Sequence, residues 1–153
     1  MSRNSFRDYF DQVDQLLEAC LNIYVESYNA TILSSERANL KIRLRFYFKY
    51  LLSISEALIA VDDQVMEIDY RYHFQDEQNN LIFRYDNTPD FPDLPSFPHH
   101  KHLPDRVISC EQPNIELVIR GFLRIIGDRY SKSGRRSFVR KICCSFLHSA
   151  INL

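Results

Sequence analysis

The sequence predicts an α+β fold, with an N-terminal helix, an antiparallel meander of four or five strands, and a C-terminal helix packed on the same sheet face. Apolar residues recur at three- and four-residue steps near residues 5–28 and 115–126, which is typical of amphipathic helices. Between residues 31 and 86 the apolar period changes to two, as in half-buried strands. Short links without a helical pattern join these strands, which favours antiparallel pairing.

The first helix is predicted from about Ser5 to Tyr28. Its apolar side chains fall on one face of a 3.6-residue repeat, and they are Phe6, Phe10, Val13, Leu17, Cys20, Leu21 and Tyr24. One such face is enough to anchor the helix on a sheet.

Four strands follow, and a fifth is possible in front of them. They are predicted near residues 40–49, 50–59, 65–75 and 81–85, and the alternative with five strands adds a shorter one at residues 31–36. In the strand near residues 40–49, Lys41, Arg43 and Arg45 alternate with apolar residues and form a basic outer face. Asn79 and Asn80 suit the left-handed backbone of a tight hairpin.

A proline-rich loop separates the strands from the second helix. All six prolines lie between Pro89 and Pro113, and Asn114 is the expected N-cap. The apolar stripe of this helix is Ile115, Val118, Ile119, Phe122 and Ile126. We predict one domain over residues 1–128 and a basic tail over residues 129–153, with a possible short helix at residues 138–147.

Composition indicates an ordinary globular chain. It has 153 residues, of which 45% are hydrophobic and 25% charged. No apolar run is long enough to cross a membrane, no secretory leader is apparent, and the four cysteines lack metal or disulfide spacing, so a reduced, cytoplasmic protein is expected. The tail holds six basic residues and no acid, leaving 13 basic against 20 acidic residues before it.

The stretch from Arg84 to His102 concentrates titratable side chains. His99, His100 and His102 lie within four positions, with Lys101 between them. Strand alternation puts Arg84 and Asp86 on one face of the last strand and Tyr85 on the other. Imidazoles exchange protons near neutral pH, so chemistry is expected here.

These segments resemble the TumE-type toxins of bacterial and archaeal toxin–antitoxin modules. The resemblance rests on YRYHFQD, LIFRYDN and FPHHKH followed by a capped helix, and it covers roughly residues 29–126. It implies a small growth-inhibiting protein that a neighbouring antitoxin neutralises. The chain departs from the family pattern at Asp90 and Phe91, where a histidine pair is usual, and in the tail after Arg129.

RNA cleavage is the leading hypothesis for the activity. Metal-free cleavage needs a base for the 2′-hydroxyl proton, an acid for the 5′-oxygen and cations for the phosphate charge. Two of the three histidines would be base and acid. Lys101 and Arg84 would neutralise the phosphate, and Asp86 would orient a histidine. RNA contacts are expected from Tyr70 and Tyr72, by stacking, and from Lys41, Arg43 and Arg45.

Several alternatives stay open at this stage. The three histidines and Asp86 could ligate Zn²⁺ or Mn²⁺, although no cofactor is required. The cluster could be turn structure, the tyrosines could be packing residues, and the basic strand could be a solvated face. The rival function is a non-catalytic toxin or binding module that acts through protein–protein or RNA binding. The oligomeric state and the target are not predicted.

Overall fold

The computed structural model describes residues 2–21 and 23–132. Its contacts divide the chain into two compact units, Met1–Pro113 and Asn114–Leu153. The predicted short helix at residues 138–147 lies outside the described residues, as does most of the basic tail.

The first helix, α1 (Ser2–Glu18), is shorter than predicted. Its buried stripe consists of Phe6, Phe10, Val13 and Leu17, as the apolar period indicated. The prediction that the helix continues to Tyr28 is wrong, because residues 23–32 form a strand. Leu21 and Tyr24, which were placed on the helical stripe, are each 59% exposed.

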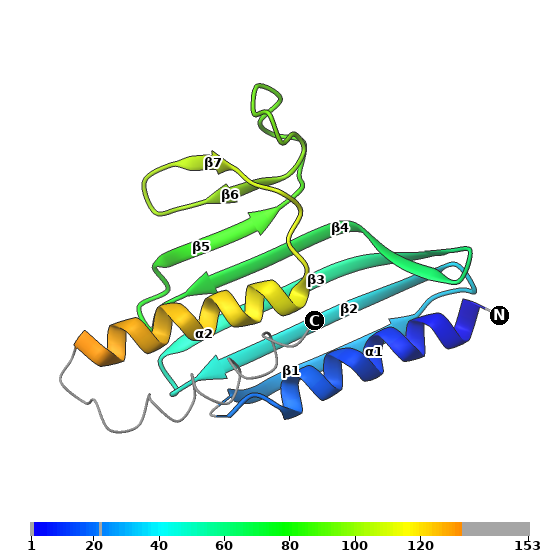
Figure 1. Cartoon of the computed structure of the whole chain (residues 1–153), viewed down its shortest axis with the longest axis horizontal. Helices are drawn as coiled ribbons and strands as arrows, with labels where there is room; N and C mark the ends of the chain where they lie inside the picture. The colour runs from blue at the N-terminus through cyan, green and yellow to red at the C-terminus, as the bar shows by residue number, and fades with distance from the viewer. Residues whose placement is uncertain (1, 22, 133–153) are drawn as a thin grey trace, which may run out of the picture. The chain divides into compact units, whose positions relative to one another are not determined.

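One antiparallel sheet fills the rest of the first unit, and within the described residues it has seven strands in the order β1 to β7 (Figure 1). The strands are β1 (Ile23–Ile32), β2 (Arg37–Phe46), β3 (Tyr50–Val61), β4 (Gln64–Gln75), β5 (Leu81–Asp86), β6 (His100–His102) and β7 (Val107–Ser109). The predicted meander is therefore confirmed, with more strands than the expected four or five.

The strands that sequence patterns missed depend on pairing rather than on local periodicity. β1 pairs with β2 along almost its whole length, from Ile23 opposite Phe46 to Ile32 opposite Ala38. Its ladder satisfies the backbone groups that a longer helix would have satisfied internally. β6 and β7 have three residues each, so they are too short to show alternation.

Residues with positive φ close three of the hairpins. Asn79 has φ 64° in the β4–β5 turn, as predicted from its tolerance of left-handed backbone. Asp62 and Asp63, with φ 50° and 60°, close the β3–β4 turn, where a pair of left-handed residues matches the twist of the strands. Tyr47 and Phe48 take the same conformation between β2 and β3.

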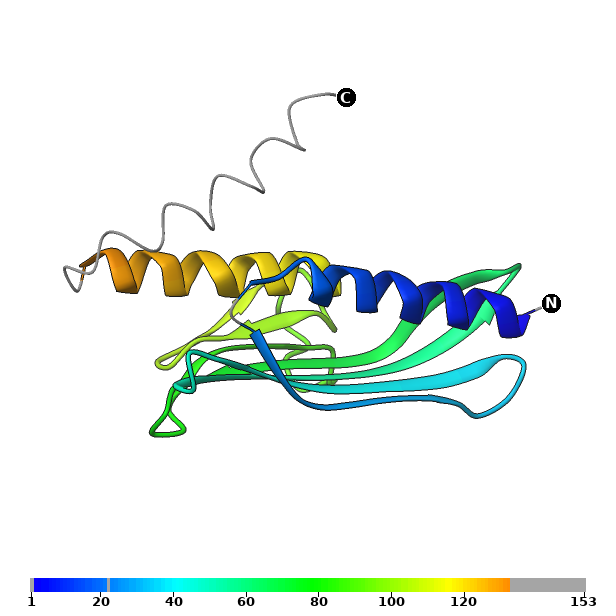
Figure 2. The same cartoon turned by 90° about the horizontal axis from the view of Figure 1, so that it is seen from below.

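The sheet has a core face and an outer face. α1 contacts β1, β3 and β4, and it lies on one side of the sheet (Figure 2). The α1 side is the core face, since the Tyr9 hydroxyl of α1 donates to Glu56 Oε2 over 2.6 Å. We call the opposite side the outer face. Its β2 members include the predicted basic residues Lys41, Arg43 and Arg45.

A polar network is buried in the core. Glu56 is 2% exposed and also accepts a hydrogen bond from the Tyr72 hydroxyl, at 2.6 Å. Tyr72 in turn stacks on Tyr70, with ring centroids 5.2 Å apart. Both oxygens of the buried carboxyl therefore have a donor, which offsets much of the cost of removing it from water.

The second unit contains α2 (Ile115–Lys132). Its start follows the predicted cap, because the Leu117 backbone N–H donates to Asn114 Oδ1 over 2.8 Å. The predicted apolar stripe from Ile115 to Ile126 is buried. The expectation that α1 and α2 share one face of the sheet stays a prediction.

Candidate functional site

The pairing of β5 with β6 assembles the central residues of the site. Arg84 lies opposite His102, and Asp86 lies opposite His100. Opposite residues of an antiparallel pair project to the same side, so these four side chains meet on the outer face. The loop from residue 87 to residue 99 closes the connection between the two strands.

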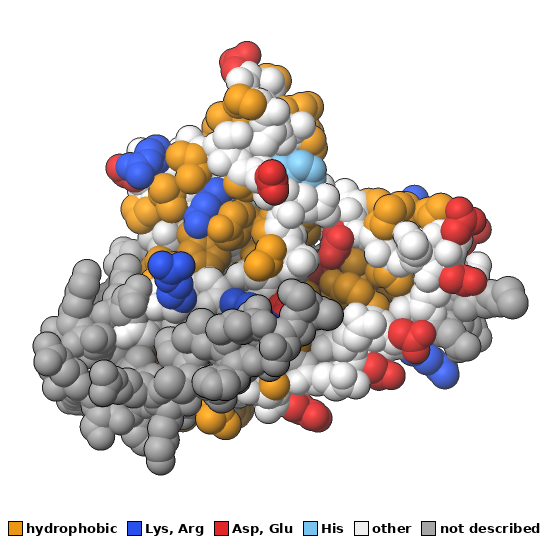
Figure 3. Space-filling view, viewed as in Figure 1, with side chains coloured by type: hydrophobic (Ala, Val, Ile, Leu, Met, Phe, Trp, Pro, Cys, Tyr) orange, Lys and Arg blue, Asp and Glu red, His pale blue; other side chains and the backbone are white. Residues whose placement is uncertain are grey.

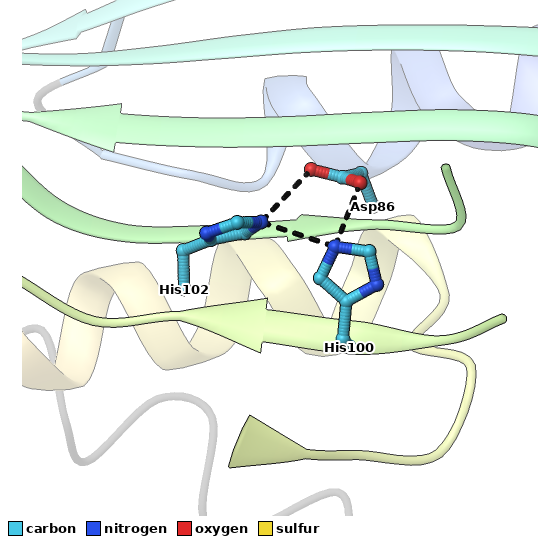
Figure 4. A group of neighbouring side chains, drawn as sticks. All are labelled: Asp86, His100 and His102. Carbon is cyan, nitrogen blue, oxygen red and sulfur yellow. Dashed lines mark hydrogen bonds and ion pairs between the residues drawn. The ribbon is translucent and has the colours of Figure 1, made fainter. Parts of the chain in front are cut away.

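The four side chains form one hydrogen-bonded cluster, and Figure 4 shows three of them turned toward a common point. His100 Nε2 lies 3.0 Å from Asp86 Oδ1 and 3.0 Å from His102 Nε2. Arg84 donates from Nε to Asp86 Oδ2 over 2.7 Å, and its Nη2 lies 2.8 Å from His102 Nε2. We call this set the Arg84–His102 cluster.

Hydrogen-bond chemistry fixes the protons of the two imidazoles. His100 Nδ1 lies 2.9 Å from the Pro98 carbonyl oxygen, which can only accept, so Nδ1 carries a proton. Arg84 can only donate, so His102 Nε2 offers its lone pair and the ring is neutral. Burial lowers the pKa of His102, and the positive charge of Arg84 lowers it further.

Asp86 is the buried anion of the cluster, with 1% of its side chain exposed. Burial opposes its ionisation, but hydrogen bonding by Thr88 and the charges of His100 and Arg84 outweigh that effect and lower its pKa. The Thr88 backbone N–H donates to Oδ1 over 3.2 Å. The ionised Asp86 carboxylate therefore lies next to both imidazoles.

The proline-rich loop covers the inner end of the cluster. The Phe91 ring meets the rings of His100 and His102 edge-on, with centroids 4.8 and 5.6 Å apart. His100 is consequently 1% exposed, whereas the side chains of His102 and Arg84 keep 16% and 28% of their surface. Asp90 and Phe91, the two positions that depart from the family pattern, are thus next to the cluster, and the charge of Asp90 opposes the lowering of the pKa of His102.

Two of the predicted catalytic residues lie on the core face instead. Lys101 is opposite Tyr85 in the β5–β6 pair, and its Nζ lies 4.6 Å from the centroid of the Tyr85 ring. His99 stacks on Tyr70 and its Nδ1 lies 3.0 Å from the Tyr70 hydroxyl. The structure therefore does not bring them together with His100 and His102, because neighbouring residues of an extended chain point to opposite sides.

The residues predicted to contact RNA also lie on two different faces of the sheet. Tyr70 and Tyr72 are 1% and 0% exposed, so their rings pack in the core and present no surface for stacking on bases. Lys41 and Arg43 are exposed and Arg45 is half-buried on the outer face. Arg43 and Arg45 both pair with Glu26 of β1.

The strand register aligns polar residues from β1 to β6 in two rows. The His102 row contains Ser27, Arg43, Ser53, His73, Arg84 and His102. The Asp86 row contains Asn29, Lys41, Ser55, Arg71, Asp86 and His100.

Arg71 and His73 were missed as site residues. Arg71 Nε is 4.0 Å from Asp86 Oδ2, and His73 is paired with Arg84. The signal in the sequence was their alternation with the apolar Tyr70, Tyr72 and Phe74.

The cluster also has the composition of a metal site. Asp86, His100 and His102 offer ligand atoms that all lie within 4.8 Å of one another. The Pro98 carbonyl holds His100 so that Nε2 points inward, as outer partners of metal-bound histidines do. The Arg84 guanidinium already contacts two of these ligand atoms, so a divalent cation would have to displace a resident positive charge.

Comparison with known proteins identifies the class of the chain. A family model described as Toxin TumE matches residues 13–130, and the chain therefore belongs to the TumE toxin family. It is the toxin component of a toxin–antitoxin module, and such a toxin has an antitoxin partner. No curated protein and no solved structure matches the chain. Among the described residues, no helix is long and apolar enough to cross a membrane.

Proposed function

We propose that this toxin cleaves RNA and that Arg84 and His102 act on the reacting phosphodiester. The observation that carries the proposal is the 2.8 Å contact of Arg84 Nη2 with His102 Nε2 on the outer face, backed by buried Asp86 and His100. A cation for phosphate and a neutral imidazole for proton removal are thereby side by side.

Arg84 binds a nonbridging phosphate oxygen, which gives its guanidinium a new acceptor and frees the lone pair of His102. His102 then takes the proton of the 2′-hydroxyl as the 2′-oxygen forms its bond to phosphorus. The bond from phosphorus to the 5′-oxygen breaks, and that oxygen needs a proton. The products are a 2′,3′-cyclic phosphate and a 5′-hydroxyl end, with no change of oxidation state.

Asp86 and His100 are positioning residues in this scheme. His100 is too buried to touch RNA, but its Nε2 contacts Asp86 Oδ1 and holds the carboxylate in place. Asp86 Oδ2 lies 3.6 Å from His102 Nε2 and stabilises the proton that His102 gains. The Asp86 charge is retained at neutral pH because its pKa is lowered.

The rest of the outer face binds the RNA backbone. Lys41 and Arg71 are exposed in the Asp86 row, Arg43 adds positive charge in the His102 row, and Arg45 lies two residues further along β2. Cations on an open sheet face attract phosphates without reading sequence. The antitoxin would neutralise the toxin by covering this face in the cytoplasm.

Induced expression of the toxin tests the proposal. Wild type, Arg84→Ala and His102→Gln are compared for growth and total RNA, with His99→Gln on the core face as the matched control. We expect RNA fragments with 5′-hydroxyl ends for wild type and control, and a loss of at least 100-fold for the other two variants, the order seen when one acid–base group is removed.

Two outcomes would oppose the proposal in different ways. Growth arrest by all four proteins with intact RNA would favour a non-catalytic toxin. Fragments with 5′-phosphate ends that disappear with EDTA would favour a metal-dependent nuclease, because such ends form when the bond from phosphorus to the 3′-oxygen breaks instead.

A further inference from the structure

His73 lies in a position that the proposed reaction needs and that the Arg84–His102 cluster leaves unfilled. In the His102 row it is directly opposite Arg84 on β4, while His102 is directly opposite Arg84 on β6. The two imidazoles therefore flank one guanidinium on the outer face. Neighbouring strands are about 4.8 Å apart, so the two histidine backbones are separated by about 10 Å.

This separation suits an in-line displacement at phosphorus. The attacking and leaving oxygens lie on opposite sides of the phosphorus, and each must be within hydrogen-bond reach of its own proton carrier. A phosphate held above Arg84 presents one such oxygen toward β6 and the other toward β4. His102 and His73 are the imidazoles on those two sides.

We propose that His73 is the general acid of the RNA cleavage inferred above, giving its proton to the departing 5′-oxygen while His102 removes the proton of the 2′-hydroxyl. The electron pair of the broken phosphorus–oxygen bond stays on the 5′-oxygen, which becomes a hydroxyl. His102 ends protonated and His73 neutral, so solvent exchange restores both. The inference rests on the proposed nuclease function.

The surroundings of His73 support this role. Its side chain is half-buried, so water can reprotonate it after each turnover. In the free protein the pKa of His73 is lowered, because burial and the charges of Arg84 and Arg71 outweigh the hydrogen bond with Gln75 that raises it. Ser53 is its partner on β3 and carries no charge. A bound phosphodiester neutralises the two arginines and so favours the protonated imidazole that an acid must have.

A change of leaving group separates a general acid from a merely structural histidine. His73→Gln is compared with wild type, His102→Gln and the control His99→Gln on single-stranded RNA and on uridine 3′-(4-nitrophenyl phosphate), whose phenolate leaves without a proton. Folding of each variant is checked by circular dichroism. On RNA we expect both His73→Gln and His102→Gln to lose about 100- to 10,000-fold in kcat/KM.

On the nitrophenyl substrate we expect His73→Gln to regain a rate within about tenfold of wild type, while His102→Gln stays impaired, since only the base is still needed. His73→Gln should also lack the fall in rate at high pH that loss of a protonated acid causes in wild type. If wild type cleaves RNA and His73→Gln cleaves it at the same rate, the role of His73 is overturned and the nuclease function stands. The same holds if His73→Gln loses equal rate on both substrates. No cleavage of either substrate by wild type overturns the proposed nuclease function and this role with it.

Discussion

Two buried carboxyl groups show how neighbours decide the charge of a residue. Asp86 and Glu56 are 1% and 2% exposed. Asp86 accepts hydrogen bonds from Thr88 and lies beside the charges of His100 and Arg84, which together lower its pKa despite burial. The partners of Glu56 are the neutral hydroxyls of Tyr9 and Tyr72, so burial dominates and raises its pKa to about 6. The first group keeps a fixed charge, whereas the second titrates.

The raised pKa of Glu56 predicts a pH-dependent stability. The folded protein holds this proton more tightly than the unfolded chain, whose carboxyl has a pKa near 4.5. The resulting stability is fully present below pH 4.5 and is lost as pH rises through about 6, and it amounts to about 2 kcal/mol. Glu56→Gln removes this titration.

Urea unfolding of wild type and Glu56→Gln across this pH range measures the effect. The free energy of unfolding of wild type minus that of the variant should fall by about 2 kcal/mol between acidic and neutral pH. A difference that stays constant with pH would contradict the assignment of a raised pKa to Glu56.

At the scale of elements, the spacing of apolar residues and the helix-capping residue predicted most of the fold. Both helices, the long strands β2 to β5 and the Asn79 turn have strong local signals. The prediction for the end of α1 was wrong because Leu21 and Tyr24 continue the helical period. Residues 23–32 form a strand by pairing with β2, and a pairing between segments leaves no mark in the local period. The strands β6 and β7 exist only because β5 offers them an edge.

The candidate site was predictable to the extent that strand alternation was applied. It placed Arg84 with Asp86, and the cluster confirms this. The same rule applied within HHKH would have separated His100 and His102 from His99 and Lys101, but that segment looked like an irregular loop. Arg71 and His73 needed the register of β4 with β5, which depends on the turn between them.

The capped start of α2 gives a prediction at this scale. Asn114→Ala leaves the Leu117 backbone N–H without its side-chain acceptor and should lower the free energy of unfolding by about 1 kcal/mol. Asn114→Asp, which can still accept this hydrogen bond, is the matched control and should stay near wild type. Urea titrations followed by circular dichroism would measure both, and equal losses in the two variants would argue against a capping effect.

At the scale of the whole molecule, charge is distributed unevenly over the first unit. The solvent-facing residues of α1 include Asp8, Asp11, Asp14 and Glu18, which are all exposed. Red acidic side chains accordingly dominate the α1 region of the face in Figure 3. The outer face carries exposed Lys41, Arg43 and Arg71, together with the exposed acid Asp69 on β4. A net charge of −1 therefore hides a surface suited to a polyanion.

This asymmetry predicts which cations contribute to RNA affinity. Each phosphate contact releases counterions, so the affinity falls with salt in proportion to the number of contacts. Lys41→Ala and Arg71→Ala should each weaken binding and lower the slope of log affinity against log salt by about 1. Arg7→Ala, which removes an equal charge from α1, should leave the slope unchanged.

Fluorescence anisotropy of a labelled single-stranded RNA over a series of KCl concentrations measures these slopes, with His102→Gln as the background that prevents cleavage. Glu26→Gln extends the test, because Glu26 holds Arg43 and Arg45 in ion pairs. Its removal frees two guanidinium groups for phosphate and should steepen the slope. If Arg7→Ala reduces the slope as much as Lys41→Ala does, RNA binding is not confined to the outer face, and the proposed binding of RNA along that face to Arg84 is contradicted.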